Sequence, residues 1–523
     1  MRDFQSPGRS AVFANNGACA TSHPLAAKVA LDVLQAGGNA ADAAIAGAVL
    51  LGICEPQMTG IGGDCFVLLK PAGSEEVIGL NGSGRAPAAL TADNLRAKGL
   101  DRMPIHGIDT VTLPGAMDAF LALNNRFGQK SMAEILAPAI HYAEEGVPVA
   151  PRVAFDWAGD AAVLQGDARK FYLLDGAAPQ TGQIFRAPGQ AEVLRRVARE
   201  GRAGFYEGEV AEDMIASLRA LGGGHSLDDL AAVKSDWTTP ISASYQGVDL
   251  IEHPPNGQGA TALLMLNILS HFDLKRLDPF GAPRAHLEAE AAKLAYDARN
   301  RFIADPTARI DHLLAPETAA RLAALIDPRR ALPDPTPLAE AVHKDTVYIT
   351  VVDRDRMAVS LIYSIFWAFG AGLASSRFGI NFQNRGAGFS LAPGHPNEAA
   401  GGKRPMHTII PGILAEGGRV TMPFGVMGGA YQPCGHARLV SNLRDYGMDL
   451  QSAIDAPRCF AGADGFKVEH GYKPQILEEL RALGHRPVPS DEPIGGAQAI
   501  VLHPSGVLEA ASDPRKDGCA LGY

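Results

Sequence analysis

The stretch HKDTVYITVVD, residues 343–353, decides how this chain is interpreted. It places Thr346 at the start of a run of β-branched and aromatic residues, the composition of a buried strand. A threonine hydroxyl is a weak nucleophile that needs an adjacent base. If the chain is cut between Asp345 and Thr346, the freed α-amino group of Thr346 becomes that base. We therefore predict a precursor that cleaves itself at this bond.

The residues around Thr346 support an accessible cleavage site. Residues 327–345 contain four prolines and show no helical or strand periodicity. Such a segment predicts an exposed tether, where chain cleavage is tolerated. The apolar runs 347–352 and 357–363 flank the polar residues 353–356, which predicts a β-hairpin after the tether. By itself, a threonine in this position would more often be an ordinary strand residue.

Composition and charge narrow the class of protein. The chain has 523 residues, of which 46% are hydrophobic and 20% charged, as is typical of globular proteins of several structural units. The net charge of −10 argues against a nucleic-acid partner or an anionic membrane surface. The six cysteines have no C-x-x-C spacing and are expected to be reduced thiols. The sequence shows no apolar leader core and no run of 18 apolar residues, so we expect a cytoplasmic protein.

The first part of the chain predicts two helices followed by two strands. A helix over 24–36 ends at Gly37-Gly38, and Asn39 caps a second, alanine-rich helix. A glycine-rich turn leads into strands over 65–69 and 77–80, and helical patterns dominate 113–326. The sequence lacks the dinucleotide-loop, phosphate-loop, zinc-helix and serine-elbow motifs, so no cofactor or metal is expected.

Eight short motifs follow one another in the order found in a known protein family. They lie at 37–44, 56–63, 113–115, 253–259, 296–299, 345–346, 427–429 and 512–523. On these motifs the chain resembles the γ-glutamyltransferase family of N-terminal-nucleophile hydrolases, nearly end to end. The resemblance implies an α/β (α+β) fold built as a four-layer αββα sandwich.

The resemblance also implies a catalytic apparatus. Autocleavage would give a large subunit, 1–345, and a small subunit, 346–523, which together form one αββα unit and could pair into a dimer of heterodimers. Thr346 would be the nucleophile and carry an ester-linked acyl intermediate. The backbone N–H groups of Gly428 and Gly429 would form the oxyanion hole, where charge develops on the substrate oxygen. Ser364 would hydrogen-bond the nucleophile in place of the family's threonine.

The expected substrate pocket departs from the family pattern. The arginine that binds the glutamyl α-carboxylate is replaced by Ser83, although Arg85 follows two residues later. The aspartate that binds the α-amino group is replaced by Gly388, and an asparagine is replaced by the larger Phe366. A pocket without an acidic side chain has no group that would pair with the ammonium group of a glutamyl substrate.

We therefore expect the substrate to be a small amide with a carboxylate and no α-amine, and oxamate is the best candidate. Segments 404–411 and 428–433 also resemble the oxamate amidohydrolase branch of the family. Two adjacent pocket serines of the family correspond here to His407 and Thr408. The candidate substrate contacts are Arg85, Arg385, His407, Thr408, Tyr431 and Gln432. The structural alternative for these side chains is an ion pair or hydrogen bond within the fold.

Two other functions stay open at this point. The chain could be a γ-glutamyltransferase or glutathione hydrolase with a rearranged pocket, or a homologue that binds a ligand without catalysis. An acylase of bulkier amides fits poorly with the volume that Phe366 takes from the pocket.

Overall fold

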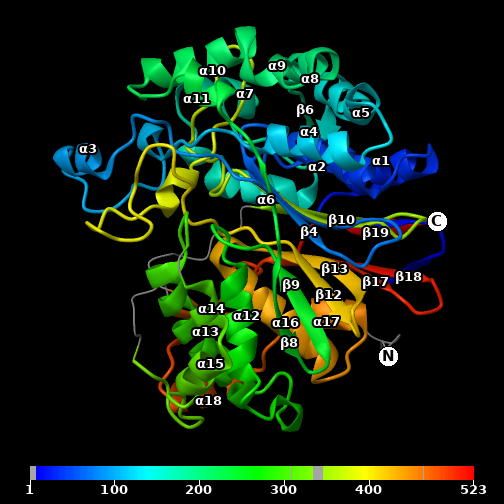
Figure 1. Cartoon of the computed structure of the whole chain (residues 1–523), viewed down its shortest axis with the longest axis vertical. Helices are drawn as coiled ribbons and strands as arrows, with labels where there is room; N and C mark the ends of the chain where they lie inside the picture. Colours follow the sequence, from blue (N-terminus) through cyan, green and yellow to red (C-terminus); the bar gives the residue numbers. More distant parts are fainter. Residues whose placement is uncertain (1–7, 308, 334–345, 463–464) are drawn as a thin grey trace.

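The computed structural model describes residues 8–307, 309–333, 346–462 and 465–523. It contains two seven-stranded antiparallel sheets that pack face to face, with helices on both outer sides (Figure 1). The layers follow the order helix, sheet, sheet, helix, so the predicted αββα fold is confirmed. Asp345 and most of the predicted tether, 334–345, lie outside the described residues.

The first sheet has the segment after Thr346 as one of its interior strands. Its strands, in spatial order, are β19 (Cys519–Gly522), β2 (Ala18–Thr21), β10 (Val347–Val352), β11 (Ala358–Ser364), β3 (Asp64–Lys70), β4 (Ile78–Gly82) and β7 (Asp236–Thr238). The β10 and β11 strands pair from Val347 opposite Tyr363 to Val352 opposite Ala358. The predicted hairpin after the tether is thereby confirmed.

The second sheet is formed mostly by the later part of the chain. Its strands, in spatial order, are β1 (Val12–Ala14), β18 (Leu508–Ser512), β17 (Gly496–Leu502), β13 (Arg419–Met427), β12 (Gly412–Glu416), β9 (Val248–Glu252) and β8 (Ile241–Tyr245). Two smaller sheets join β14 (Cys459–Gly462), β15 (Gly465–Val468) and β16 (Pro487–Pro489), and β5 (Val147–Pro148) with β6 (Ile184–Phe185).

Helices from the two halves of the chain lie on opposite sides of the sandwich (Figure 1). On the side of the first sheet are α1 (Pro24–Gln35), α2 (Ala40–Cys54), α3 (Ala92–Ala97), α4 (Ala116–Phe127), α5 (Met132–Glu145), α6 (Pro151–Asp160), α7 (Gly166–Tyr172), α8 (Pro188–Glu200), α9 (Ala203–Tyr206), α10 (Gly208–Ala220) and α11 (Leu227–Ala231). On the side of the second sheet are α12 (Gly259–Leu269), α13 (Ala282–Phe302), α14 (Ile310–Leu314), α15 (Pro316–Ala323), α16 (Gln432–Arg444), α17 (Leu450–Asp455) and α18 (Pro474–Ala482). Short 3-10 turns are η1 (Ile108–Thr110), η2 (Ala161–Val163) and η3 (Leu274–Arg276).

Strand β10 is buried on both faces, which accounts for its unbroken apolar sequence. On one face Ile349 contacts α2, where a Cβ added at Gly47 would come within 2.4 Å of the isoleucine Cδ1. On the other face the Tyr348 ring contacts β13, where a Cβ added at Gly425 would lie 2.3 Å from the ring. Glycine is therefore required at both places by the close approach of the layers.

The helix boundaries near the N-terminus agree with the sequence analysis. Helix α1 ends at Gln35, and Gly37 follows with a φ of 84°. Asn39 caps α2 through a capping box with Asp42. Helices dominate 113–326 as expected, but this region also contributes the short β5 and β6 and the strands β7, β8 and β9, which were not predicted. No helix among the described residues has both the length and the apolar character needed to cross a bilayer.

Buried charges tie the C-terminal motif 512–523 to the rest of the fold. The Asp513 carboxylate lies 2.5 Å from the Arg458 guanidinium, and Lys516 Nζ lies 3.6 Å from Asp156 Oδ2. Glu55, at the end of α2, is also buried and accepts a hydrogen bond from Ser22. Burial raises the pKa of the Glu55 carboxyl to about 7, although the Lys516 ammonium acts in the opposite direction.

The raised pKa of Glu55 predicts that the protein loses stability as the pH rises. The folded state holds this proton more tightly than the unfolded chain does, whose carboxyl keeps the ordinary value of 4.5. The stabilisation that this proton gives is complete below pH 4.5, the pKa of the carboxyl in the unfolded chain. It is lost as the pH rises through about 7, the pKa of the carboxyl in the folded protein. Relative to Glu55→Gln, which does not titrate, wild type should lose on the order of 3 kcal/mol of unfolding free energy across this range. Urea unfolding of both proteins at a series of pH values measures the difference, and parallel profiles would contradict it.

Candidate active site

Thr346 directly precedes β10 and is fully buried. The register of β10 against β11 continues one step past Val347 and Tyr363 to set Thr346 opposite Ser364. Thr346 Oγ1 lies 3.4 Å from Ser364 Oγ. The two hydroxyls that the sequence analysis paired are therefore adjacent.

Ser364 connects Thr346 to a buried arginine. Ser364 Oγ accepts a hydrogen bond from the Phe366 N–H at 2.9 Å and lies 3.4 Å from Arg385 Nη2. Arg385 begins the 3-10 turn η4 (Arg385–Gly388), and its Nη1 donates to Thr408 Oγ1 at 2.9 Å. A guanidinium in such a desolvated place is suited to bind a carboxylate through charge-assisted hydrogen bonds.

The ring of Phe366 supports this arginine. The Arg385 Cζ atom lies 4.0 Å from the centroid of the ring, a cation–π distance. Phe366 has a φ of 83°, which is uncommon for a residue with a bulky side chain. Backbone conformations of this kind cluster at functional sites, where surrounding contacts hold them. Phe366 therefore helps to fix the position of Arg385.

A glycine turn follows β13 at the same end of the sandwich. Met427, the last residue of β13, packs in one buried cluster with Tyr348 of β10. Gly428 and Gly429 have φ values of 126° and 54°, conformations that favour glycine. Tyr431 N donates to Gly428 O at 2.9 Å, which closes the turn into η5 (Gly429–Tyr431). The same two glycines are the predicted oxyanion donors.

A glutamine links this turn to the arginine. Gln258 Nε2 donates to Thr408 O at 2.6 Å and to Gly429 O at 3.0 Å. Thr408 is also the residue whose hydroxyl accepts from Arg385. The contacts therefore form one continuous path from the predicted nucleophile through the arginine to the predicted oxyanion turn.

Comparison with known proteins identifies the family. The gamma-glutamyltranspeptidase family model matches residues 26–523. The chain belongs to this family. Among its relatives, the oxamate amidohydrolase proenzyme of Klebsiella pneumoniae is 35% identical over 97% of this chain and 98% of its own length. The glutathione hydrolase-like YwrD proenzyme of Bacillus subtilis is 33% identical over 96% and 97%.

A solved structure agrees with this assignment. The cephalosporin acylase from Bacillus halodurans is 38% identical in sequence, covers 100% of this chain and 99% of its own, and superimposes with a TM-score of 0.92. Because the named relatives in this gamma-glutamyltranspeptidase family are hydrolases and acylases, the chain is an amide hydrolase or acyl transferase.

Two of the sequence-predicted substrate contacts have other partners in the structure. Arg85 has a side chain that is 41% exposed, and its Nη1 lies 3.2 Å from Asp305 Oδ2 and 3.0 Å from Gly402 O. His407 is buried, with its Nε2 3.0 Å from Asp64 Oδ2 and its Nδ1 accepting from Ile409 N at 3.4 Å. Both side chains thus form contacts within the fold, and their roles as substrate contacts stay predictions. Neither is joined by a described hydrogen bond to Thr346, Ser364 or Arg385.

His407 is held neutral in this position. Burial and the nearby Arg385 guanidinium lower the pKa of the imidazole to about 3. The neutral ring then carries its proton on Nε2 and donates it to Asp64, since Nδ1 accepts from a backbone N–H. His407 therefore holds the start of β3 through its hydrogen bond to Asp64, and its neutral ring offers no positive charge to a substrate carboxylate.

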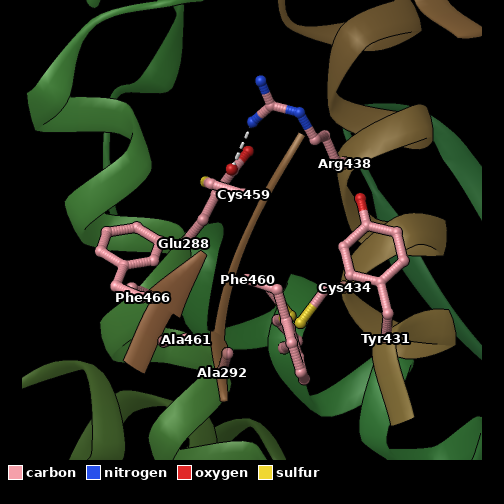
Figure 2. Close-up of a pocket in the computed structure, with 11 residues that line it drawn as sticks. Glu288, Ala292, Tyr431, Cys434, Arg438, Cys459, Phe460, Ala461 and Phe466 are labelled. Atoms are coloured by element: carbon pink, nitrogen blue, oxygen red, sulfur yellow. Dashed lines mark hydrogen bonds and ion pairs between the residues drawn. The ribbon is translucent and has the colours of Figure 1, made fainter. Parts of the chain in front are cut away.

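Tyr431 and Gln432 have side chains within the helical side of the second sheet. Tyr431 lines a cavity of about 10 Å³, room for about one water molecule, together with Cys434, Cys459 and Phe460 (Figure 2). Its hydroxyl has no hydrogen-bond partner in the described part of the chain. Gln432 Oε1 accepts from Ile410 N at 2.8 Å. The cavity lies behind the glycine turn and is lined by core residues, so Tyr431 does not extend toward Arg385.

Two residues of the site were not predicted from the sequence. Gln258 lies within the motif 253–259, and Asp64 directly precedes the predicted strand over 65–69. Asp64 Oδ1 accepts from Gly84 N at 2.7 Å and from Gln383 Nε2 at 2.8 Å, in addition to the contact of its Oδ2 with His407. An aspartate between a glycine-rich turn and an apolar strand was a usable signal, because a carboxylate in such a buried place needs hydrogen-bond partners.

One group of described residues has the chemistry of a metal site. Possible ligand atoms of His286, Glu290 and His485 lie within 4.8 Å of one another. These atoms already contact protein groups, with His286 Nδ1 2.7 Å from His485 Nε2 and Lys293 Nζ 2.9 Å from Glu290 Oε1. The Lys293 ammonium opposes the binding of a cation, so we assign no metal to this group.

The position of Tyr431 gives a direct test of its predicted role. Removing a buried hydroxyl that has no partner should leave the protein as stable as wild type or slightly more stable. Tyr431→Phe should therefore keep the KM and kcat of wild type within about twofold. Amidase kinetics and thermal unfolding measure both effects. A KM at least tenfold above that of wild type would instead show that the Tyr431 hydroxyl contacts the substrate.

Proposed function

We propose that this chain is a self-processing amide hydrolase that acts on a small amide acid, with oxamate as the best candidate. Cleavage between Asp345 and Thr346 would give subunits 1–345 and 346–523. The relatives from Klebsiella pneumoniae and Bacillus subtilis are named proenzymes, which supports processing. The position of Thr346 at the very start of β10, beside Ser364, supports its role as the new N-terminal residue.

The proposed reaction uses groups of the chain alone. The α-amine of Thr346 takes the proton of its own hydroxyl while Oγ1 forms a bond to the amide carbon. Negative charge moves to the carbonyl oxygen, where the N–H groups of Gly428 and Gly429 would stabilise it. The intermediate collapses to an acyl ester and releases ammonia, which carries away the proton. Water then hydrolyses the ester, and the proton released with the new carboxylate is taken up by ammonia, so that oxamate and water give oxalate and ammonium.

Arg385 is the single observation that carries the choice of substrate. Its guanidinium lies 3.4 Å from Ser364 Oγ, which in turn lies 3.4 Å from Thr346 Oγ1. A carboxylate bound by Arg385 therefore has to lie within a few bonds of the carbon that Thr346 attacks. In oxamate the carboxylate carbon is bonded directly to the amide carbon. A γ-glutamyl group carries its α-carboxylate beyond three further carbons, so its carboxylate can lie farther from the attacked carbon than the carboxylate of oxamate.

The alternative is hydrolysis or transfer of γ-glutamyl groups, in line with the glutathione hydrolase names among the relatives. Such a substrate would bring an ammonium group into the site. The residue expected to face it is Gly388, which has no carboxylate to offer. The nearby buried Arg385 would repel an ammonium group as well. These charges favour the small amide acid.

Replacement of Thr346 tests the proposed chemistry. Wild type should run as two bands on a denaturing gel, at about two thirds and one third of the chain length, and release ammonia from oxamate. Thr346→Ala should stay as one band and release none, because it lacks the attacking hydroxyl. Wild type should also hydrolyse oxamate faster than a γ-glutamyl anilide.

A second threonine of the same strand provides the matched control. Thr350 is buried in β10, and its hydroxyl donates to Val359 O at 2.9 Å. Thr350→Ala should still be cut and active, even if it is less stable. Activity in Thr346→Ala would overturn the mechanism, and faster turnover of the anilide by wild type would favour the γ-glutamyl alternative.

The two arginines offer a matched test of carboxylate binding. Loss of a charge-assisted hydrogen bond costs about 1.5–3 kcal/mol, which corresponds to a roughly 10- to 150-fold change. Arg385→Met should therefore raise the KM for oxamate by about that factor, whereas Arg85→Met should change it little. A neutral small amide should show a much smaller effect of Arg385→Met. If Arg85→Met has the larger effect on oxamate, Arg85 is the carboxylate contact after all.

A further inference from the structure

Two sequence motifs, 253–259 and 296–299, have no role in the proposed reaction. Both contribute to a set of buried contacts around the glycine turn after β13. The first motif supplies Gln258, which directly precedes α12, and the second supplies Tyr296 and Arg299 near the end of α13. All three side chains are buried. Each of them forms a hydrogen bond that leads to the turn or to its neighbour Thr408.

Every hydrogen-bonding group of the Gln258 amide has a partner. Nε2 donates to Thr408 O at 2.6 Å and to Gly429 O at 3.0 Å. Oε1 accepts from Arg299 Nη1 at 2.8 Å, and the Arg299 guanidinium lies 4.6 Å from the Tyr296 ring centroid. The opposite orientation of the amide would point its oxygen at two carbonyl oxygens and its NH₂ group at the guanidinium. The network therefore permits only one orientation.

The carbonyl oxygens of the turn are held one after another. Gly428 O accepts from Tyr431 N at 2.9 Å, Gly429 O accepts from Gln258, and Ala430 O accepts from the Tyr296 hydroxyl. In a trans peptide the N–H points opposite to the preceding carbonyl. Holding these carbonyls thus fixes the directions of the N–H groups that follow them. The Gly428 carbonyl, held by Tyr431 N, orients the Gly429 N–H, which is a predicted oxyanion donor. The Gly429 carbonyl, held by Gln258, orients the next peptide, so Gln258 acts on the donor by fixing the adjacent peptide of the same turn.

We propose that Gln258 is a positioning residue that holds the oxyanion turn and the arginine site as one unit. Its two N–H groups join the main chain of Thr408, whose hydroxyl accepts from Arg385, to Gly429. Without them, the turn and the Thr408 segment would each lose a buried partner and could shift relative to Thr346. This inference rests on the proposed amidase function, because it concerns the geometry of the same site.

Replacement of Gln258 separates positioning from simple stability. Gln258→Met keeps the side-chain length and removes all three hydrogen bonds, while Gln258→Glu keeps an acceptor for Arg299 and removes both donors. The matched control is Gln190→Met, since Gln190 is also buried and donates from Nε2 to the Tyr172 hydroxyl at 3.0 Å, within the helical layer of the first sheet. Purified, processed proteins are compared by thermal unfolding and by oxamate kinetics.

Both Gln258 variants should lower kcat about 10- to 100-fold with KM changed less than about threefold, because a misplaced oxyanion donor affects the transition state alone. Gln190→Met should lower the melting temperature by a similar amount and leave kcat unchanged. Equal kcat values in Gln258→Met and Gln190→Met overturn the proposal, as does a failure of both Gln258 variants to fold and process. A wild-type protein that releases no ammonia from any small amide overturns the proposed function, and this inference falls with it.

Discussion

The site depends above all on the antiparallel pairing of β10 with β11 inside a sheet that is buried on both faces. Thr346 is the residue before β10 and Ser364 is the last residue of β11, so the register alone makes their hydroxyls neighbours. The strand has no freedom to slide, because Ile349 fills the space left by Gly47 and Tyr348 fills that left by Gly425. A shift by one residue would turn every buried side chain of the strand to the wrong face.

The rest of the site comes from the second sheet and meets the first only because the sheets stack. The segment before β12 supplies Thr408, and the turn after β13 supplies Gly428 and Gly429. Arg385 bridges the two contributions, with one nitrogen near Ser364 and another bound to Thr408. In surroundings of low dielectric these contacts are strong, and an unmatched polar group would be costly. The position of the arginine is therefore closely determined.

The hydrogen bonds show which of the predicted substrate contacts also support the fold. Arg85 has an aspartate partner at the surface, and His407 uses both ring nitrogens within the protein. Asp64 holds His407, Gln383 and the Gly84 backbone, and it pairs with Ser364 in the sheet register. Arg85 and His407 are thus held by contacts within the fold, and the guanidinium that lies buried beside Ser364 is that of Arg385.

The sequence by itself determined the layers, the hairpin after the tether, the capped helices near the N-terminus and the threonine to examine. These features follow from local periodicity, from capping residues and from motifs that occur in a known order. Only the tertiary structure placed Arg385, and not Arg85, beside Ser364, buried Tyr431 in the core and brought Gln258 to the glycine turn. Gln258 and Gly429 are 171 residues apart in the chain, and their contact depends on how the segment before α12 lies against the turn after β13. No local pattern encodes such a contact, because the direction of a buried side chain is set by the neighbours that fill the space around it.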